Sequence, residues 1–348
     1  MRVVLVERRS PGEQSQLEEL AALSKTLNYE IAGVLRQVRK PDPAYHIGRG
    51  KVAELAELVK STGAKRVIFS NQLTPSQAYK LSRTVGVEVI DRFQLILEIF
   101  AMRAGSPEAK LQVEYAKLSY ELPRIREQVR AAMSAEQPGL MGGGEYEVDV
   151  YYDMVKRKLA NLRRKLKSVA KTREQRRKLR RRRGFKLVAL AGYTNSGKST
   201  LLNTLTSAKA EVDDMYFTTL MPRTRAVRAS KKILLTDTVG FIDGLPPWMV
   251  EAFKATLEEI YLADLVVLVV DASDPIPEIL RKFRASREVL AEYPVRVITA
   301  LNKIDLVANK ELKRILTVLN NLSPVIVPIS ALDGTNLRAL LNVIRTNV

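Results

Sequence analysis

Hydrophobic and polar positions alternate through the first hundred residues in a pattern that predicts strands and helices in turn. Short apolar runs are typical of buried strands, and they fall at Val3–Val6, Glu30–Val38, Arg66–Ser70 and Val87–Ile90. Stretches whose apolar residues recur every three or four positions predict helices, near Gln14–Leu27, Gly50–Thr62, Pro75–Val85 and Asp91–Ala104. Strands alternating with helices favour a parallel sheet. Residues 1–104 are therefore expected to form a small parallel-sheet α/β domain.

Two longer helical segments follow. Apolar residues at helical spacing predict one helix from Glu108 to Ala135, in which Pro123 is expected to kink or interrupt the chain. The segment Gln137–Glu145 is too rich in glycine for a helix or a strand, and a second helix is expected from about Val150. Two antiparallel helices joined by a flexible tip predict a helical hairpin over residues 105–184.

In the last part of the chain, residues 185–348, apolar strands each lead into a polar or glycine-containing segment. The expected strands are Lys186–Ala191, Ile233–Leu235, Val295–Leu301 and Val325–Ile329, and Thr200–Thr206 is expected to start a helix. Ligands in open parallel sheets bind at the carboxyl ends of the strands. The pattern thus predicts a doubly wound α/β domain whose ligand lies at these four segments.

The first segment fits the phosphate-binding pattern G-x-x-x-x-G-K-[ST], in the strand–turn–helix context that this motif needs. Backbone N–H groups of the turn and of the helix N-terminus would bind phosphate oxygens. Lys198 is expected to reach the β- and γ-phosphates, and the Ser199 hydroxyl to coordinate Mg²⁺. The expected phosphate-binding residues are Gly192, Tyr193, Thr194, Asn195, Ser196, Gly197, Lys198 and Ser199.

The other three segments indicate a guanine nucleotide. Asp237, Thr238, Val239 and Gly240 follow the second strand, where an aspartate holds Mg²⁺ through water and a glycine admits the γ-phosphate to its N–H. After the third strand come Asn302, Lys303, Ile304 and Asp305, and an aspartate there accepts two N–H bonds from guanine. Ser330, Ala331 and Leu332 follow the fourth strand, with backbone groups for the guanine oxygen.

Each segment alone has a simpler interpretation. Asp237 would serve as a strand-end cap, Asn302 as a turn residue and Ser330 as a helix cap. All four segments in this order, each at the end of a predicted strand, are together very improbable by chance. The sequence therefore predicts a site for GTP or GDP.

These motifs resemble the translation-factor-related class of P-loop GTPases. The resemblance implies a threonine between Ser199 and Asp237 that folds over the γ-phosphate and completes the Mg²⁺ shell. The segment Phe217, Thr218, Thr219, Leu220 and Met221 supplies it, and the match to the family pattern favours Thr219. Mg²⁺ is then expected on Ser199, on Thr219 and, through water, on Asp237, with Lys198, Thr219 and Gly240 as the catalytic residues.

Two positions bear on turnover. Many small GTPases carry a glutamine after the glycine of the second motif, where it orients the attacking water. This chain has Phe241 instead, which cannot hydrogen-bond water, so unaided hydrolysis is expected to be slow. Asn195 stands where some GTPases of this class use an asparagine to help bind K⁺. Local stabilisation of the loop by its side chain is an equally good interpretation.

The composition narrows the class of protein. The chain of 348 residues has no cysteine and one histidine, His46, which argues against disulfides, thiolate metal sites and His-based hydrolysis. No apolar stretch is long enough to span a bilayer, and the N-terminus resembles a strand rather than a signal peptide. We therefore expect a soluble intracellular protein. The net charge of +19 calls for a polyanionic partner.

Much of that charge falls in the second expected hairpin helix. Residues 156–183 contain 16 lysines and arginines against one acid, Glu174. Leu159, Leu162, Leu166 and Val169, with Leu179 as a further candidate, form one narrow apolar stripe at helical spacing for most of this segment. A helix face that only contacts solvent normally carries both positive and negative charges. A face with positive charges alone favours binding to the phosphate backbone of a nucleic acid. Nucleic acid is the preferred interpretation, ahead of an acidic membrane surface or a merely solvated helix.

Seven short segments spread along the chain are distinctive in combination: Pro41–Tyr45, Ile47–Lys51, Asp91–Leu97, Ala109–Glu114, Tyr120–Arg124, Gly192–Asn195 and Asp237–Phe241. Through these segments the chain resembles, over nearly its full length, the HflX family of ribosome-associated GTPases. Family members commonly have a longer, arginine-containing hairpin tip, so a tip contact with ribosomal RNA is not carried over. Many bacterial members also continue into another small domain after the position of Val348, and functions of that extension are not carried over either.

The resemblance implies a GTP-hydrolysing switch that binds the large ribosomal subunit and its rRNA through the basic helix 156–183. Its role would lie in translation, ribosome rescue or splitting, or ribosome biogenesis. We expect a cytoplasmic, partly ribosome-associated monomer. Two alternatives stay open. One is an RNA-remodelling protein with a second, ATP-binding site near Gly48–Lys51 in the N-terminal domain. The other is a GTP-dependent binding module with negligible turnover.

Overall fold

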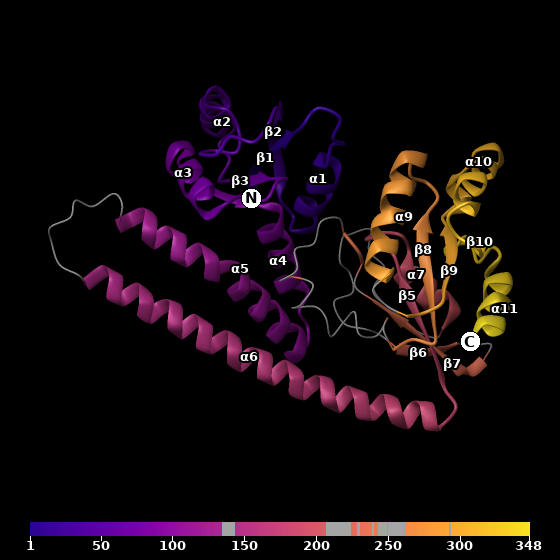
Figure 1. The fold of residues 1–348 in the computed structure, drawn as a ribbon. Helices are drawn as coiled ribbons and strands as arrows, with labels where there is room; N and C mark the ends of the chain where they lie inside the picture. Colours follow the sequence, from indigo (N-terminus) through magenta and orange to yellow (C-terminus); the bar gives the residue numbers. More distant parts are fainter. Residues whose placement is uncertain are drawn as a thin grey trace. The chain divides into compact units, whose positions relative to one another are not determined.

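The computed structural model describes residues 1–133, 143–206, 224–227, 230–238, 240–242, 249, 260, 262–291 and 294–348 (Figure 1). The chain divides into two compact units. The N-terminal unit comprises Met1–Ala104 and Lys110–Lys165, and the C-terminal unit comprises Gly105–Ala109 and Leu166–Val348. The three domain ranges expected from the sequence remain a prediction.

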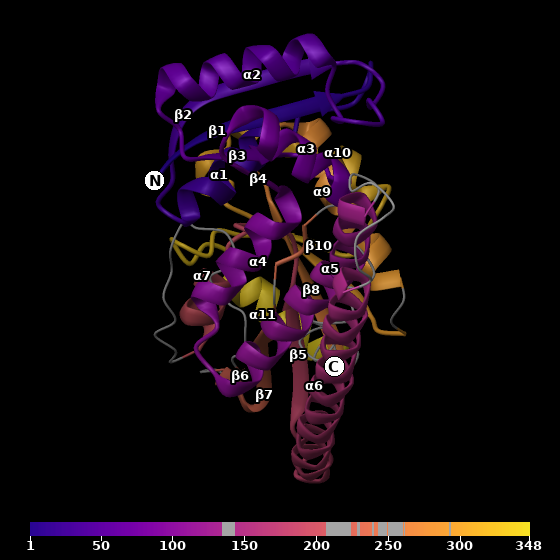
Figure 2. The same cartoon turned by 90° about the vertical axis from the view of Figure 1, so that its left-hand side faces the viewer.

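The N-terminal unit is built on a parallel sheet in the order β2-β1-β3-β4. Its strands are β1 (Arg2–Arg9), β2 (Glu30–Val38), β3 (Arg66–Phe69) and β4 (Glu88–Asp91). The connecting helices are α1 (Leu17–Thr26), α2 (Arg49–Thr62), α3 (Pro75–Val85) and α4 (Arg92–Arg103). Val3–Val6 of β1 are all buried, because helices cover both faces of such a sheet. Buried apolar residues of β1, β3, α2 and α3 form one core. Figure 2 shows the helices and strands that contribute to it.

Local signals in the sequence fix the ends of α3 and α4. Thr74 and Gln77 form a reciprocal capping box at the start of α3, where Pro75 takes the first helical position. Gly86 ends α3 with a φ of +77°. The buried carboxylate of Asp91 caps α4 by accepting a bond from the Gln94 N–H at 3.0 Å.

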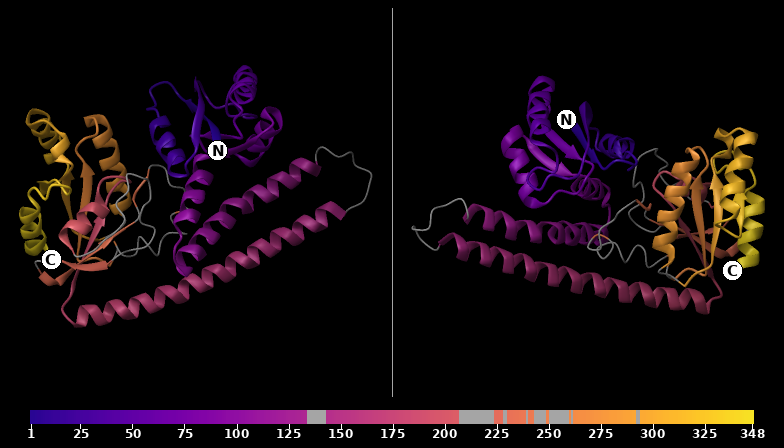
Figure 3. Two further views of the ribbon diagram at one scale, coloured as in Figure 1. Left: turned by 180° about the vertical axis from the view of Figure 1, so that it is seen from behind. Right: turned by 45° about the horizontal axis from the view of Figure 1, so that its top comes forward.

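Two long helices follow, α5 (Pro107–Met133) and α6 (Gly143–Arg182). Within the N-terminal unit they lie side by side (Figures 1 and 3), and Lys158 pairs with Glu114 at 2.7 Å. Pro123 lies inside α5 and does not interrupt it. The expected start of the second helix was wrong, because α6 begins at Gly143 and includes glycines assigned to the tip. The rest of the expected tip, residues 137–142, lies outside the described residues.

The C-terminal unit contains, among the residues described, a sheet in the order β10-β9-β8-β5-β7-β6. Its strands are β5 (Lys186–Ala191), β6 (Thr224–Val227), β7 (Ser230–Asp237), β8 (Leu265–Asp271), β9 (Val297–Asn302) and β10 (Ile326–Pro328). Neighbours pair in parallel except β6 with β7. Sequence analysis did not identify β6 or β8.

The helical elements of this unit are α7 (Lys198–Leu205), α9 (Ile276–Ala291), the 3₁₀ turn η1 (Ile304–Leu306), α10 (Asn309–Asn320) and α11 (Leu337–Asn347). Helices α7 and α11 share one apolar core with β5, β8 and β9. The expected mixed α/β fold class, with a parallel-sheet unit, a helical region and a doubly wound phosphate-loop unit, is confirmed. No helix in the described ranges is both long and apolar enough to cross a membrane.

Candidate nucleotide-binding site

The four predicted segments gather at one edge of the C-terminal sheet. Strands β5, β7, β9 and β10 run parallel, so the residues that follow them leave the sheet on the same side. The segments that begin at Gly192, Thr238, Lys303 and Ile329 all lie there. This is the edge at which parallel α/β sheets bind ligands.

Two glycines give the phosphate loop its path. Gly192 has a φ of +145°, and a β-carbon there would overlap the carbonyl oxygen of Val269. Gly197 has a φ of +91°, and a β-carbon there would overlap the side-chain amide of Asn302. Helix α7 begins at the next residue, Lys198. The loop therefore turns tightly and presents the N-terminus of α7, as the motif predicts.

Lys198 is buried beneath this loop. Its ammonium Nζ donates to the carbonyl oxygens of Gly192 at 3.1 Å and Tyr193 at 2.7 Å. The pKa of Lys198 is lowered to about 8, chiefly by burial; the carboxylate of Asp237 opposes this shift, and the positive charge of Lys303 adds to it. Burial costs the ammonium group its hydration, and a phosphate placed beside it would compensate this loss.

The second motif brings a carboxylate to the start of α7. The register pairs Leu190 of β5 with Asp237 of β7, and the Ser199 hydroxyl donates to Asp237 Oδ2 at 2.7 Å. Asp237 is fully buried. A hydroxyl and a carboxylate oxygen this close suit Mg²⁺, which proteins commonly hold through one or two carboxylates together with substrate phosphates. The predicted partners Phe217–Met221 and Val239 lie outside the described residues.

Gly240 and Phe241 pack against the phosphate loop. A β-carbon at Gly240 would lie 2.7 Å from Thr194 Cγ2 and 2.9 Å from Thr194 Cα. The N–H of Phe241 donates to Gly192 O at 2.9 Å, and the N–H of Thr194 donates to Phe241 O at 3.0 Å. Phe241 is 3% exposed. Phe241 is therefore buried, and its backbone is bonded to the phosphate loop on both sides.

Asn302 joins two of the loops. Its Nδ2 donates to the Ser196 carbonyl at 2.9 Å, and its Oδ1 accepts the Ala331 N–H at 2.9 Å. Both bonds are buried. The predicted base-binding segment thus ties the phosphate loop to the segment after β10. Sequence reasoning missed this role, because the three residues are far apart in the chain.

The remaining predicted residues line the same edge. Lys303 has a φ of +64°, and its ammonium lies 2.6 Å from Asp271 Oδ2 at the end of β8. Asp305 is exposed in η1. Ser330 is fully buried and accepts the Asp333 N–H at 3.1 Å, whereas Leu332 is 76% exposed. The sequence signal for Asp271 was available in the apolar run that it ends, but that run was not recognised as a strand.

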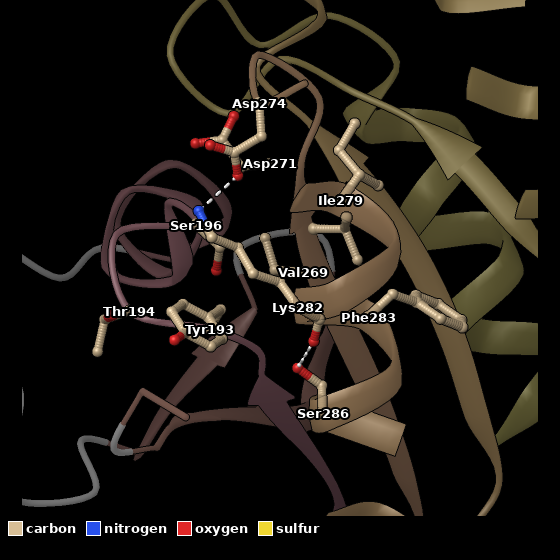
Figure 4. Close-up of a pocket in the computed structure, with 11 residues that line it drawn as sticks. Tyr193, Thr194, Ser196, Val269, Asp271, Asp274, Ile279, Lys282, Phe283 and Ser286 are labelled. Atoms are coloured by element: carbon tan, nitrogen blue, oxygen red, sulfur yellow. Dashed lines mark hydrogen bonds and ion pairs between the residues drawn. The ribbon is translucent and has the colours of Figure 1, made fainter. Parts of the chain in front are cut away.

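Helix α9 supports the phosphate loop from one side (Figure 4). Arg281 and Lys282 place their cations 5.5 and 5.3 Å from the centre of the Tyr193 ring. A cavity of about 10 Å³ lies between the loop and this helix, which is room for roughly one water molecule. The buried hydroxyl oxygens of Thr194 and Ser196 have no hydrogen-bond partner within the described structure. Such atoms commonly mark the place of a ligand or water.

Family models match three successive parts of the chain. A model described as GTP-binding GTPase N-terminal matches residues 14–101, and one described as GTP-binding GTPase Middle Region matches residues 103–180. A model described as 50S ribosome-binding GTPase matches residues 187–310. Together they match most of the chain.

Individual relatives are similar over most of the chain. GTPase HflX of Thermococcus kodakarensis is 49% identical over 311 residues, covering 88% of this chain and 70% of the relative. GTPase HflX of Methanocaldococcus jannaschii is 46% identical over 322 residues, covering 91% of this chain and 79% of the relative. A solved structure, the crystal structure of a GTP-binding protein from Sulfolobus solfataricus in complex with GDP, matches with a TM-score of 0.53. Its sequence is 30% identical, and the match covers 99% of this chain and 98% of that chain.

The lowered pKa of Lys198 predicts a pH dependence of nucleotide affinity. Phosphate favours the charged lysine, so affinity for GDP is full well below pH 8. Above pH 8 it falls by up to about tenfold per pH unit, because free protein must then take up a proton on binding. Calorimetric titration with GDP from pH 7 to 9, in buffers of different ionisation enthalpy, measures both effects.

Lys198→Arg is the matched control, since a guanidinium does not titrate in this range. Its residual affinity should change less with pH than that of the native protein. A flat profile with no proton uptake in the native protein would contradict the prediction.

Proposed function

The chain belongs to the HflX family of GTPases, and on that premise we propose that it is a guanine-nucleotide switch whose GTP-bound form associates with the large ribosomal subunit. One observation carries the nucleotide part of this proposal. The buried ammonium of Lys198 and the Ser199–Asp237 pair lie together under a glycine turn at the ligand-binding edge of the sheet. That arrangement suits a phosphate chain with a divalent cation.

Each side chain at this edge has a proposed role. The backbone from Gly192 to Ser199 binds phosphate oxygens, and Lys198 neutralises charge on the β- and γ-phosphates. Ser199, Thr219 and, through water, Asp237 hold Mg²⁺. When bound, Mg²⁺ supplies charge neutralisation at the phosphates. Asp305 and the backbone of Ser330–Leu332 bind the guanine base, while Asn302 holds their loops together.

The proposed hydrolysis depends on positioning and charge rather than on a general base. Lys198 stabilises charge on the transferred phosphoryl group, and Thr219 and Gly240 contact it. Phe241 offers the attacking water no hydrogen bond, so we propose a slow unaided rate. Asn195, exposed at the tip of the phosphate loop with a φ of +62°, is the proposed contact for K⁺.

The proposed ribosomal partner rests on charge and on the family. Helix α6 exposes the basic side chains of Lys156, Arg157, Arg163, Arg164 and Arg182, and the exposed Arg183 follows the helix. Neutralisation of phosphates by such side chains releases counterions and drives RNA binding. We propose a monomer that works in the cytoplasm and is partly ribosome-associated. Its step in translation, ribosome rescue or ribosome biogenesis is left open.

No observation favours the alternative ATP site in the N-terminal unit. The N–H of Gly48, which would have to bind a phosphate, already donates to Gln37 Oε1 at 2.9 Å. A β-carbon at this glycine would overlap the guanidinium of Arg39, so the space beside it is filled. The alternative of a binding module without turnover is decided by the hydrolysis assay below.

The proposed function predicts that large ribosomal subunits stimulate GTP hydrolysis. Steady-state release of phosphate is measured with and without purified subunits, in K⁺ and in Na⁺, across a series of salt concentrations. We expect slow turnover alone, clear stimulation that weakens with salt, and faster turnover in K⁺. Absence of stimulation together with salt-insensitive cosedimentation would contradict the ribosomal role, and equal rates in K⁺ and Na⁺ would contradict the role of Asn195.

Guanine recognition predicts a switch of base preference. Asp305→Asn removes an acceptor for the guanine N–H groups, and an amide suits the additional oxygen of xanthine. We expect GTP affinity to fall by about tenfold or more, because the guanine N–H groups lose a charged hydrogen-bond acceptor. XTP affinity should rise. Asp333→Asn, a matched change in the loop after β10, should leave both affinities nearly unchanged. Unaltered GTP affinity in Asp305→Asn would refute the proposed role.

A further inference from the structure

A cavity of about 440 Å³ lies within the N-terminal unit. This volume is within the range of small-ligand sites, about 300–1,000 Å³. Helices α3, α4, α5 and α6 contribute its main polar and aromatic side chains: Tyr79, Ser82, Gln94, Glu121, Arg124 and Tyr151. None of these residues belongs to the nucleotide site described above.

The spacing of the lining residues shows how the sequence builds the walls. On α3, Ser82 lies three positions after Tyr79 and four after Ala78, so its side chain shares a helix face with each of them. Glu121 and Arg124 lie three positions apart on α5 and face the same cavity. Tyr151 comes from the N-terminal part of α6. Three helices thus turn polar and aromatic side chains toward a common space.

Arg124 makes one wall rigid. Its guanidinium donates to Gln94 Oε1 at 3.1 Å and to the Leu73 carbonyl at 3.4 Å. It also lies 3.5 Å from the buried carboxylate of Asp91 and 4.0 Å from the centre of the Tyr120 ring. A guanidinium held from several sides orients the amide of Gln94 before any ligand arrives, which lowers the entropic cost of binding.

The two tyrosines of the cavity are open to solvent. Tyr79 is 48% exposed and Tyr151 is 45% exposed, and both line the cavity. Aromatic rings exposed in this way offer flat faces on which an unpaired nucleobase stacks. The amide of Gln94, the carboxylate of Glu121 and the hydroxyl of Ser82 then supply donors and acceptors for the edge of the base.

Charge around the cavity suits the nucleotide backbone. Arg83 places its guanidinium 5.9 Å from the centre of the Tyr79 ring, and Lys80 is exposed on the same helix. On α6, the exposed Lys156 and Arg157 follow Tyr151 within two helical turns. A cavity with aromatic faces and basic neighbours is the combination by which proteins bind single-stranded nucleic acid.

We propose that this cavity binds an unpaired nucleobase of single-stranded RNA, stacked on Tyr79 and Tyr151. The choice of RNA rests on the ribosomal partner proposed above, and the site itself rests on the cavity. Phosphates flanking the base lie on Arg83 and on the basic face of α6. A fully paired RNA helix, whose bases are stacked inside, does not fill the cavity.

The test uses the full-length protein saturated with GDP and Mg²⁺, so that the nucleotide site is occupied. The affinity of a fluorescein-labelled oligouridine is measured by anisotropy. Tyr79→Ala and Tyr151→Ala each remove one stacking surface and should weaken binding about 5- to 150-fold. Tyr79→Phe and Tyr151→Phe keep the rings and should bind within about twofold of the native protein.

Controls separate the site from general attraction to phosphate. Unchanged GDP affinity and unchanged thermal unfolding verify that the exposed tyrosines were removed without damage to the fold. A blunt RNA duplex of equal length should bind the alanine variants as it binds the native protein, because only backbone charge holds it. UMP should compete far more weakly than the oligonucleotide.

Three outcomes would overturn the proposal. The first is an alanine variant of either tyrosine that binds oligouridine as tightly as the native protein does. The second is an equal loss of duplex binding in the alanine variants, and the third is UMP that binds as tightly as the oligonucleotide, which would indicate a free-nucleotide site. The assay contains no ribosomes, so its failure is distinguishable from failure of ribosomal stimulation.

Discussion

Close backbone packing around the phosphate loop is the constraint on which the nucleotide site depends. Three glycines have no room for a β-carbon: Gly192 lies against Val269, Gly197 against Asn302 and Gly240 against Thr194. Each contact joins the loop to a different strand end, so the positions of β8, β9 and β7 are set by the same turn. An L-residue at Gly192 or Gly197 would also be strained by the positive φ. The loop is therefore held in one shape by its neighbours, and that shape directs Lys198 inward.

The same packing explains why the loops after different strands act as one site. Gly192 O accepts bonds both from Lys198 Nζ and from the N–H of Phe241, so a shift of the second motif moves an acceptor of the buried lysine. Asn302 makes a comparable link between Ser196 and Ala331. These bonds are buried, where a lost partner costs about 1–3 kcal/mol. A change at the proposed phosphate site is therefore expected to reach Phe241 and the proposed base-binding segment through these bonds.

Sequence predicted most helices and strands of the fold, because local signals specify them, while the roles of the individual site residues stay predictions. Pro75–Val85 was predicted with the bounds that α3 has, since a capping box and a glycine mark its ends. Strand β8 was missed because its apolar run ends in no recognised motif. The start of α6 at Gly143 was also missed, since glycine costs only about 1 kcal/mol in a helix and a long helix absorbs that cost. Local patterns do not reveal interactions between segments that are distant in the chain. Two examples are the hydrogen bond of Asn302 with Ser196 and the ion pair of Lys303 with Asp271.

Helix α6 leads along the chain into the strand that precedes the phosphate loop. It is one continuous helix from Gly143 to Arg182, and β5 begins at Lys186, four residues after the helix ends. β5 then leads directly into Gly192 and the phosphate loop. A contact on the basic residues near Arg182 and Arg183 is therefore expected to act on the strand that leads into the loop. Coupling between two sites requires that ligands at each bias a shared element. Along the chain, β5 joins the end of the basic helix to the start of the phosphate loop, so β5 is where we expect RNA contact and nucleotide state to be coupled.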